Sequence, residues 1–293
     1  MGIKPAFADR ITDRVIIVIM LVLIIVTAYP LLYVILASIS DGAKMMAHSG
    51  ILLAPYGFHL DAYVKVLNNP GIWRGYFNTF TIVAASLLVN MSVTSLTAYV
   101  LSRKGVFWNK TFIGIILFTM FFNGGLIPFY LVVKGTGLMN SLWSLIIPFS
   151  INTFNLIIMR TAFMAVPDSL EESATIDGAN HLTIFWRIVL PLSRPTLAVM
   201  AFYYMVEKWN AWFYASLFLK DRDLFPLQLV LREILISNST DSLLGSVDLV
   251  SAVELSESIK YATIVVATIP ILCVFPFIQR YFVKGVMIGA VKG

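Results

Sequence analysis

The residues best placed to do chemistry are acidic, and they gather in one polar stretch, residues 167–191, between segments apolar enough to cross a membrane. Asp168 can cap a helix, and Glu171 three residues later can complete a reciprocal capping box. Gly178 is suited to end that helix, because glycine enters the left-handed region at the least steric cost. A second short helix is expected over residues 180–189. The stretch therefore predicts an amphipathic helix–turn–helix that lies on a membrane face and is not buried in lipid.

The chemistry of this stretch is not expected to be catalysis. No pair of acids is placed for hydrolysis, and the phosphate-binding pattern Gly-x-x-x-x-Gly-Lys-Ser/Thr does not occur. The histidines, His48, His59 and His181, are scattered without metal-ligand spacing. The chain is therefore expected to be a non-enzyme that holds no metal ion or cofactor and does not hydrolyse ATP itself.

One spaced motif runs through the stretch: Glu172-Ser173-Ala174, then Gly178 after three residues, then Ile188-x-Leu190-Pro191 after nine more. It resembles the EAA loop in permease subunits of bacterial ATP-binding-cassette importers, with Ser173 in place of the middle alanine. In that family the loop is a coupling helix, which docks in a cleft of a cytoplasmic ATPase and passes its motion to the transmembrane helices. The resemblance implies an ATPase-coupling set of Glu171, Glu172, Ala174, Asp177, Gly178, Ala179, Leu190 and Pro191.

Composition excludes a large soluble globule. Of the 293 residues, 59% are hydrophobic and only 13% are charged, whereas about 25% is usual for soluble domains. The mean hydropathy is +0.85. The net charge of +5 does not indicate nucleic-acid binding, because the basic residues do not cluster with aromatic ones. Cys273, the single cysteine, lies in an apolar run and is expected to serve in packing.

Six apolar segments are each long enough to span a bilayer. The first is longer than the apolar core of a signal peptide and has no cleavage site, so it is expected to be retained. The sequence predicts an all-α membrane protein with one permease domain over residues 1–293, a short surface helix over 61–67 and a cytoplasmic tail over 283–293. The expected spans are 15–38, 77–102, 112–133 (broken near 123–125), 142–163, 196–219 and 259–282.

The distribution of basic residues sets the expected orientation. Twelve basic and six acidic residues fall on the side that holds both termini, and eight basic and nine acidic residues fall on the other. Lysine and arginine are enriched in cytoplasmic loops. Both termini and the polar stretch are therefore expected in the cytoplasm, which makes the chain a multi-pass protein of the bacterial cell membrane.

Polar residues inside the expected spans form a candidate substrate pathway. Glu207 and Lys208 lie near the middle of the fifth span, where a charge is costly and usually faces a cavity or a partner. Because neighbouring residues point about 100° apart on a helix, these two are not expected to neutralise each other. Aromatic and amide groups beside them suit a sugar ring. The alternative is an ion pair with a neighbouring subunit and tryptophans at the membrane interface. The candidate set is Asn123, Asn152, Asn155, Tyr203, Glu207, Trp209, Asn210 and Trp212.

Two roles remain possible for the asparagines in this set. Asn152 and Asn155 are three residues apart and are expected to share one face of the fourth helix. Asn123 lies at the break in the third span. Buried amides in lipid must find partners, so these residues either line a pathway or bond between helices.

Three further motifs resemble the second permease subunit of carbohydrate importers of the maltose, alginate or oligosaccharide type. They are the segment from Asn123 to Pro128, the pair Trp209-Asn210, and the C-terminal pattern Lys-Gly-Val-Met-x-Gly-x-Val-Lys-Gly. This resemblance implies a sugar substrate and the following partners: a second homologous permease, two cytoplasmic ATPases that bind ATP and Mg²⁺, an external solute-binding protein and membrane lipid. It also implies that the tail can reach between the ATPases.

Two alternatives remain open. The first is the same mechanism with a non-sugar solute, since only the weaker motifs indicate carbohydrate. The second is an ion-coupled or proton-coupled secondary transporter with Glu207 as its coupling site. Such transporters commonly contain internal repeats. The sequence shows no obvious repeat, and this alternative leaves the polar stretch unexplained.

Overall fold

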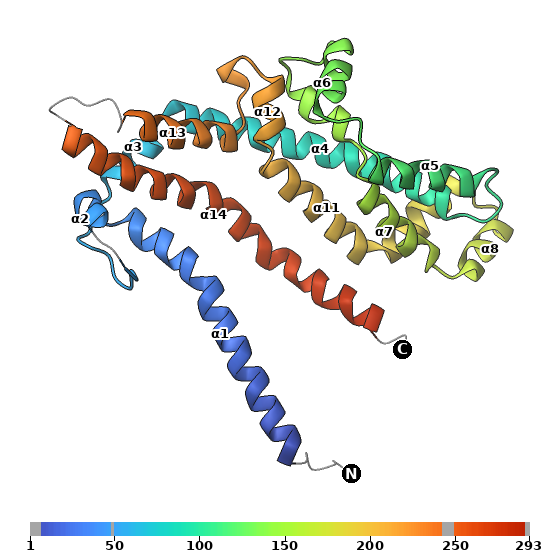
Figure 1. The fold of residues 1–293 in the computed structure, drawn as a ribbon. Helices are drawn as coiled ribbons and strands as arrows, with labels where there is room; N and C mark the ends of the chain where they lie inside the picture. Colours follow the sequence, from blue (N-terminus) through green and yellow to red (C-terminus); the bar gives the residue numbers. More distant parts are fainter. Residues whose placement is uncertain (1–6, 48–49, 242–248, 291–293) are drawn as a thin grey trace. The chain divides into compact units, whose positions relative to one another are not determined.

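The computed structural model describes residues 7–47, 50–241 and 249–290, and within them every regular element is a helix (Figure 1). The predicted all-α class is confirmed. The chain forms two compact units, which are described separately. One consists of Met1–Asn69 with Glu233–Thr268, and the other of Pro70–Arg232 with Ile269–Gly293.

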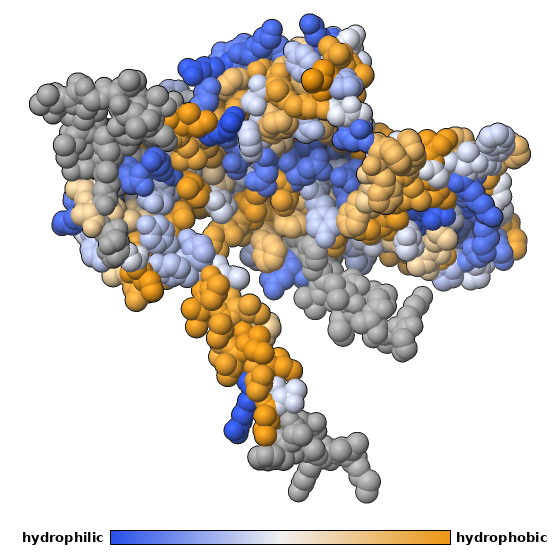
Figure 2. All heavy atoms as spheres, viewed as in Figure 1, coloured by the Kyte–Doolittle hydropathy of each residue, from blue (hydrophilic) through white to orange (hydrophobic). Residues whose placement is uncertain are grey.

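The first unit contains a long apolar helix, α1 (Phe7–Ser38), and two short ones, α2 (Gly42–Ala47) and α3 (Asp61–Leu67). The predicted surface helix over residues 61–67 is confirmed by α3. From residue 15 to residue 26 the large apolar side chains of α1 are at least half exposed (Figure 2). A helix that is apolar on every side is suited to a hydrocarbon environment.

Three helices of the described chain are long and apolar enough to cross a membrane, and three bent helix pairs pass the same test. If each bent pair counts as one span, the candidates number up to six. The long helices cover Ile11–Ser38, Pro70–Ser102 and Glu257–Phe277; the bent pairs are Asn109–Phe121 with Leu126–Gly135 at 117°, Leu142–Phe149 with Thr153–Met164 at 49°, and His181–Leu192 with Arg194–Trp209 at 83°.

The second unit is arranged along α4 (Pro70–Ser102), which packs against α7 (Thr153–Met164) and α11 (Arg194–Trp209) (Figure 1). Two apolar cores lie along α4. One gathers around Tyr99, Phe163 and Phe185, near the end of α4. The other gathers around Ile82, Leu145 and Phe218. The same helix therefore positions both groups of predicted functional residues.

The other helices are short, except for α13 (Leu227–Asp241) and α14 (Leu249–Ala290), each of which has residues in both units. The short ones are α5 (Asn109–Phe121), α6 (Leu126–Gly135), η1 (Leu142–Leu145), η2 (Ile147–Phe149), α8 (Asp168–Ile176), α9 (His181–Ile184), η3 (Phe185–Val189), α10 (Leu190–Leu192), α12 (Phe213–Phe218) and η4 (Arg222–Leu224).

Several predicted helix boundaries are wrong. The second span begins at Pro70, because proline is well placed in the first turn of a helix. The fourth is not one helix, since Pro148 lies in the 3₁₀ turn η2 and Asn152 caps a new helix, α7. The fifth ends at Trp209 and resumes in α12 after a short break.

The C-terminal boundaries also differ from the prediction. The segment between the fifth and sixth predicted spans, residues 220–258, contains α13 and the beginning of α14. The sixth predicted span, 259–282, lies inside α14, which continues to Ala290. The last part of the predicted tail, 291–293, lies outside the described residues.

Candidate functional site

The predicted helix–turn–helix is present. Its first helix, α8, ends at Ile176, and Gly178 two residues later has a φ of +83°. The amide of Ala179 donates to the carbonyl of Ala174 at 2.9 Å, and the amide of Gly178 donates to that of Thr175 at 3.0 Å. These two bonds form a Schellman motif, which satisfies the last carbonyls of the helix. The predicted glycine stop is confirmed.

The second helix of the motif begins where expected. Asn180 caps α9, and its side-chain oxygen accepts a hydrogen bond from the amide of Thr183 at 2.8 Å. The helix continues through the π-helical turn η3 and α10 to Leu192. We call this helix–turn–helix, residues 168–192, the elbow. Its second helix is also the first member of the bent pair that contains α11.

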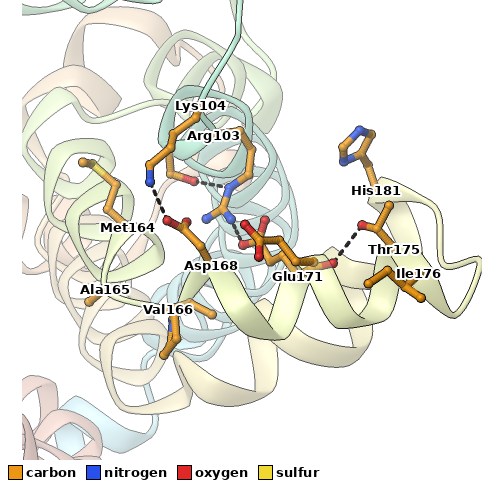
Figure 3. A pocket seen from close by; sticks show the side chains of 13 residues that line it. Arg103, Lys104, Met164, Ala165, Val166, Asp168, Glu171, Thr175, Ile176 and His181 are labelled. Atoms are coloured by element: carbon orange, nitrogen blue, oxygen red, sulfur yellow. Dashed lines mark hydrogen bonds and ion pairs between the residues drawn. The ribbon is translucent and has the colours of Figure 1, made fainter.

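The predicted capping box is wrong. Pro167 occupies the N-cap position of α8, so Asp168 is already helical. The acidic side chains turn instead to the end of α4, where Asp168 pairs with Lys104 and Glu171 pairs with Arg103 (Figure 3). Acids in the first turn still complement the positive end of the helix dipole.

Arg103 is the more enclosed of the two bases. Its side chain is 14% exposed and that of Glu171 is 17% exposed. Burial lowers the pKa of the Arg103 guanidinium, and this effect is opposed by Tyr99 and by Asp168. A guanidinium nevertheless stays charged at any physiological pH. The pair is therefore a charged contact that is largely shielded from water.

The Lys104–Asp168 pair lies in solvent, since the two side chains are 86% and 57% exposed. The hydrogen bond from Lys104, together with its charge, holds the pKa of Asp168 below its usual value, and the same bond raises the pKa of Lys104. Exposed ion pairs of this kind contribute little to stability.

A cavity of about 930 Å³ lies beside these pairs (Figure 3). Its walls come from the end of α4, the connection between α7 and α8, α8 itself and the start of α9. Glu172, Thr175 and His181 contribute polar groups, and Met164 and Val166 contribute apolar ones.

The residues of the predicted ATPase-coupling set divide between two faces. Ala174, Ala179 and Leu190 are partly buried against the apolar core at the end of α4. Glu171 and Pro191 are also partly buried, whereas Glu172, Asp177 and Gly178 are exposed. Beside the exposed residues, Ile176 leaves 87% of its surface uncovered. The outward face of the elbow therefore combines negative charge with an apolar side chain.

The second predicted group lies at the break between α11 and α12. Lys208 is only 4% exposed, and its Nζ donates to the carbonyl of Leu145 at 3.2 Å. The same Nζ is 3.5 Å from Glu207 Oε1, so the prediction that the two residues do not neutralise each other is wrong. The long lysine side chain reaches back to its neighbour, close to the end of α11 and not in the middle of a span.

The aromatic residues at this break differ in environment. Trp209 is buried and contacts Phe80 edge-on, with ring centroids 5.6 Å apart. Trp212 is exposed, and the centre of its ring lies 4.2 Å from the guanidinium carbon of Arg232. Asn210 donates from its side chain to the carbonyl of Val206 at 2.8 Å, which holds the end of α11.

The structure does not bring the remaining amides into this group. Asn123 Oδ1 accepts from the amide of Gly125 at 2.8 Å and shapes the turn between α5 and α6. Asn152 Oδ1 accepts from the backbone amide of Asn155 at 3.2 Å, so Asn152 caps α7 and the two residues do not share a face of one longer helix. Tyr203 is exposed on α11.

A residue that sequence reasoning missed connects these elements. Tyr204 is fully buried, and its hydroxyl accepts a hydrogen bond from the amide of Asn152 at 3.1 Å. The same hydroxyl shares a hydrogen bond with Thr94 Oγ1 at 2.8 Å. It therefore joins α4, α7 and α11. The available signal was the tyrosine itself, because a buried tyrosine hydroxyl usually has a partner.

Replacing Tyr204 by phenylalanine is expected to lower the free energy of unfolding by about 1–2 kcal/mol, because two hydrogen bonds inside the membrane part are lost. Thermal unfolding of the purified protein in detergent measures this change. Tyr130→Phe is the control, because the Tyr130 hydroxyl has no hydrogen bond to any described residue. Equal losses of unfolding free energy in the two variants would show that the Tyr204 hydroxyl does not stabilise the junction of α4, α7 and α11.

Comparison with known proteins agrees with the geometry. Residues 1–288 match the family described as "Binding-protein-dependent transport system inner membrane component". Protein LplC of Bacillus subtilis is 41% identical over 92% of this chain and 90% of its own. The polygalacturonan/rhamnogalacturonan transport system permease protein YtcP of the same organism is 40% identical over 97% of this chain and 99% of its own.

A solved structure gives the same result. The crystal structure of a bacterial ABC transporter involved in the import of the acidic polysaccharide alginate contains a chain 31% identical to this one, with a TM-score of 0.85. The match covers 96% of this chain and all of the other. The resemblance to importer permeases is confirmed, and the chain belongs to the family of inner membrane components of binding-protein-dependent transport systems.

Proposed function

We propose that the chain is a transmembrane permease subunit of an ATP-driven importer, which moves a sugar or oligosaccharide across the inner membrane. The observation that carries this proposal is the outward face of α8. The inner side of the elbow is packed and ion-paired within the chain, whereas Glu172, Asp177 and Ile176 remain exposed. A polar rim around an apolar contact is the usual arrangement at a protein–protein interface.

The six-span topology is part of this proposal, with each bent pair counted as one span and both termini in the cytoplasm. The excess of basic residues beside the termini and the elbow supports it. In this orientation α8 faces the compartment that contains ATP. The secondary transporter that the sequence left open has less support, because the family consists of binding-protein-dependent systems.

Partner subunits supply the energy in this mechanism. Two cytoplasmic ATPases bind ATP and Mg²⁺, and α8 moves with them as they close. The helices attached to α8 then pass from an inward-facing to an outward-facing arrangement, together with a second, homologous permease. An external binding protein delivers the solute. Each ligand must prefer one of the two states, since a ligand with equal affinity for both shifts nothing.

The proposed substrate class is an oligosaccharide that carries carboxylates. YtcP is named for polygalacturonan and rhamnogalacturonan, and the solved neighbour imports alginate, so acidic sugar polymers occur twice among the relatives. Within this chain the proposed pathway runs past the break between α11 and α12. There Trp212 and Asn210 offer a ring face and an amide of the kind that sugar sites use, whereas the carboxylate of Glu207 is paired with Lys208.

Isolating the intact complex and measuring its ATPase activity over a panel of saccharides tests this proposal. The complex is reconstituted with its binding protein and given oligogalacturonates, alginate fragments, neutral arabino-oligosaccharides and amino acids. We expect an ATPase to co-purify and acidic oligosaccharides to stimulate it most. Stimulation by amino acids alone would favour the non-sugar alternative. Uptake that survives loss of ATP and collapses with an uncoupler would favour the secondary transporter.

A further inference from the structure

We propose that Arg103 is a positioning residue that clamps the coupling helix α8 to α4 and α7, so that the three elements move as one body. This inference rests on the proposed coupling role of α8. The clamp concerns contacts inside this chain, and its test can therefore be separated from the binding of an ATPase.

The contacts of Arg103 reach three elements. One terminal nitrogen pairs with Glu171 of α8, and the other donates to the carbonyl of Phe163, in α7, at 2.8 Å. Nε donates to Ser102 Oγ at the end of α4 at 3.0 Å. The guanidinium carbon also lies 5.0 Å from the centre of the Tyr99 ring, in α4. The rigid fork of arginine can make all these contacts at once, whereas a lysine ammonium is a single point of charge.

Two neighbouring contacts strengthen the same junction. Arg160 of α7 donates from Nε to the carbonyl of Leu101 at 2.8 Å, near the end of α4. The hydroxyl of Tyr99 donates to the carbonyl of His181 at the start of α9 at 3.2 Å. The end of α4 is therefore tied to α7, α8 and α9, and a displacement of α8 is transmitted to α4 and α7 together.

The clamp also separates the roles of the two adjacent glutamates. The carboxylate of Glu171 is occupied by Arg103 inside the chain, where both side chains are mostly buried. Glu172 is exposed and remains available for a partner. The resemblance placed both glutamates in one coupling set. The geometry instead assigns Glu171 to the contact between α8 and the rest of this chain, and Glu172 to the surface that docks on the partner.

The chain contains a matched control. Lys104 and Asp168 join the same two elements, α4 and α8, but their side chains are largely exposed. An exposed pair of this kind holds its partners weakly. If charge pairing alone positioned α8, replacing Arg103 or Lys104 would loosen α8 equally. The clamp predicts that replacing Arg103 loosens α8, whereas replacing Lys104 does not.

The first test measures the mobility of α8 directly. Ser169, on α8, and Val100, on α4, are both exposed, and each is replaced by cysteine and spin-labelled in a Cys273→Ser background. Double electron–electron resonance spectroscopy then measures the distribution of distances between the two spin labels in the reconstituted protein. We expect R103Q to broaden this distribution at least about twofold, because a helix end released from buried contacts samples more orientations. K104Q should leave it unchanged, and R103K should lie between them.

The second test measures coupling in the whole transporter, as sugar imported per ATP hydrolysed. R103Q should lower this ratio about tenfold, the factor expected when one buried charge-assisted contact is lost. K104Q should stay within about twofold of the unmodified protein, as for an exposed pair. A residue that served stability alone would lower the yield of complex but leave the ratio unchanged.

Several results would overturn the clamp: a narrow distribution with normal coupling in R103Q, or equal effects of R103Q and K104Q. Should R103Q fail to fold, R103K decides, because it keeps the charge beside Glu171 and loses the fork. An unchanged distribution in R103K would then reject the proposal. If no ATPase binds the unmodified chain, the proposed function fails, while the label distances still test the clamp.

Discussion

Glu172→Lys is expected to reduce sugar uptake by at least about thirtyfold, because losing one partner of a charge pair that docking buries costs about 2–5 kcal/mol. Glu172 is exposed on the outward face of α8, and its side chain forms no hydrogen bond or ion pair with any described residue, although its charge helps to raise the pKa of the exposed Lys104. The substitution therefore acts on the partner and not on the fold. Co-purification of the ATPase and uptake of labelled oligosaccharide measure the two effects.

Two controls accompany this variant. Glu172→Gln removes the charge without reversing it, so its uptake should lie between that of the unmodified protein and that of Glu172→Lys. The free energy of unfolding of Glu172→Lys should change by less than about 0.5 kcal/mol, as is usual for an exposed residue. If the ATPase still binds and uptake is normal, α8 is not the docking element, and the proposed coupling role is wrong.

Gly178→Val is expected to reduce uptake about tenfold through a local change in the turn between α8 and α9. The φ of Gly178 is +83°, and a Cβ placed there would meet no atom within 4 Å. The cost is therefore that of the left-handed backbone alone, about 1–2 kcal/mol for most residues and more for a β-branched one. Uptake and ATPase stimulation in the reconstituted complex measure the loss.

Gly178→Asn separates conformation from size. Asparagine is larger than glycine but tolerates the left-handed region, and the turn has room for its side chain. We expect it to retain most of the uptake that valine loses. Equal losses in both variants would mean that the exposed turn is itself a contact surface, where any side chain obstructs the partner.

Local signals account for what could be predicted of the candidate site. The stop at Gly178 depends on one residue's freedom to take a positive φ, and the second helix depends on the cap at Asn180. Neither requires knowledge of distant residues. The surface helix α3 was also predicted at its observed bounds, Asp61–Leu67.

The breaks in the spanning segments were harder to predict, because the packing of neighbouring helices decides them. The turn near Asn123 was expected, whereas the break between α11 and α12 and the short 3₁₀ turns before α7 were not. In each case apolar length indicated a span. At the break between α11 and α12 another element supplies a partner, since the carbonyl of Leu145 accepts a hydrogen bond from Lys208.

The sequence by itself determined that the chain is an all-helical membrane protein with one polar elbow, because hydropathy, glycine and helix caps act over a few residues. Only the tertiary structure decided what the acids of that elbow do. Asp168 and Glu171 could satisfy their charges locally in a capping box, but Lys104 and Arg103 lie across from them in the fold. A shielded ion pair between distant parts of the chain depends on how α4 and α8 pack, and no local pattern records that packing.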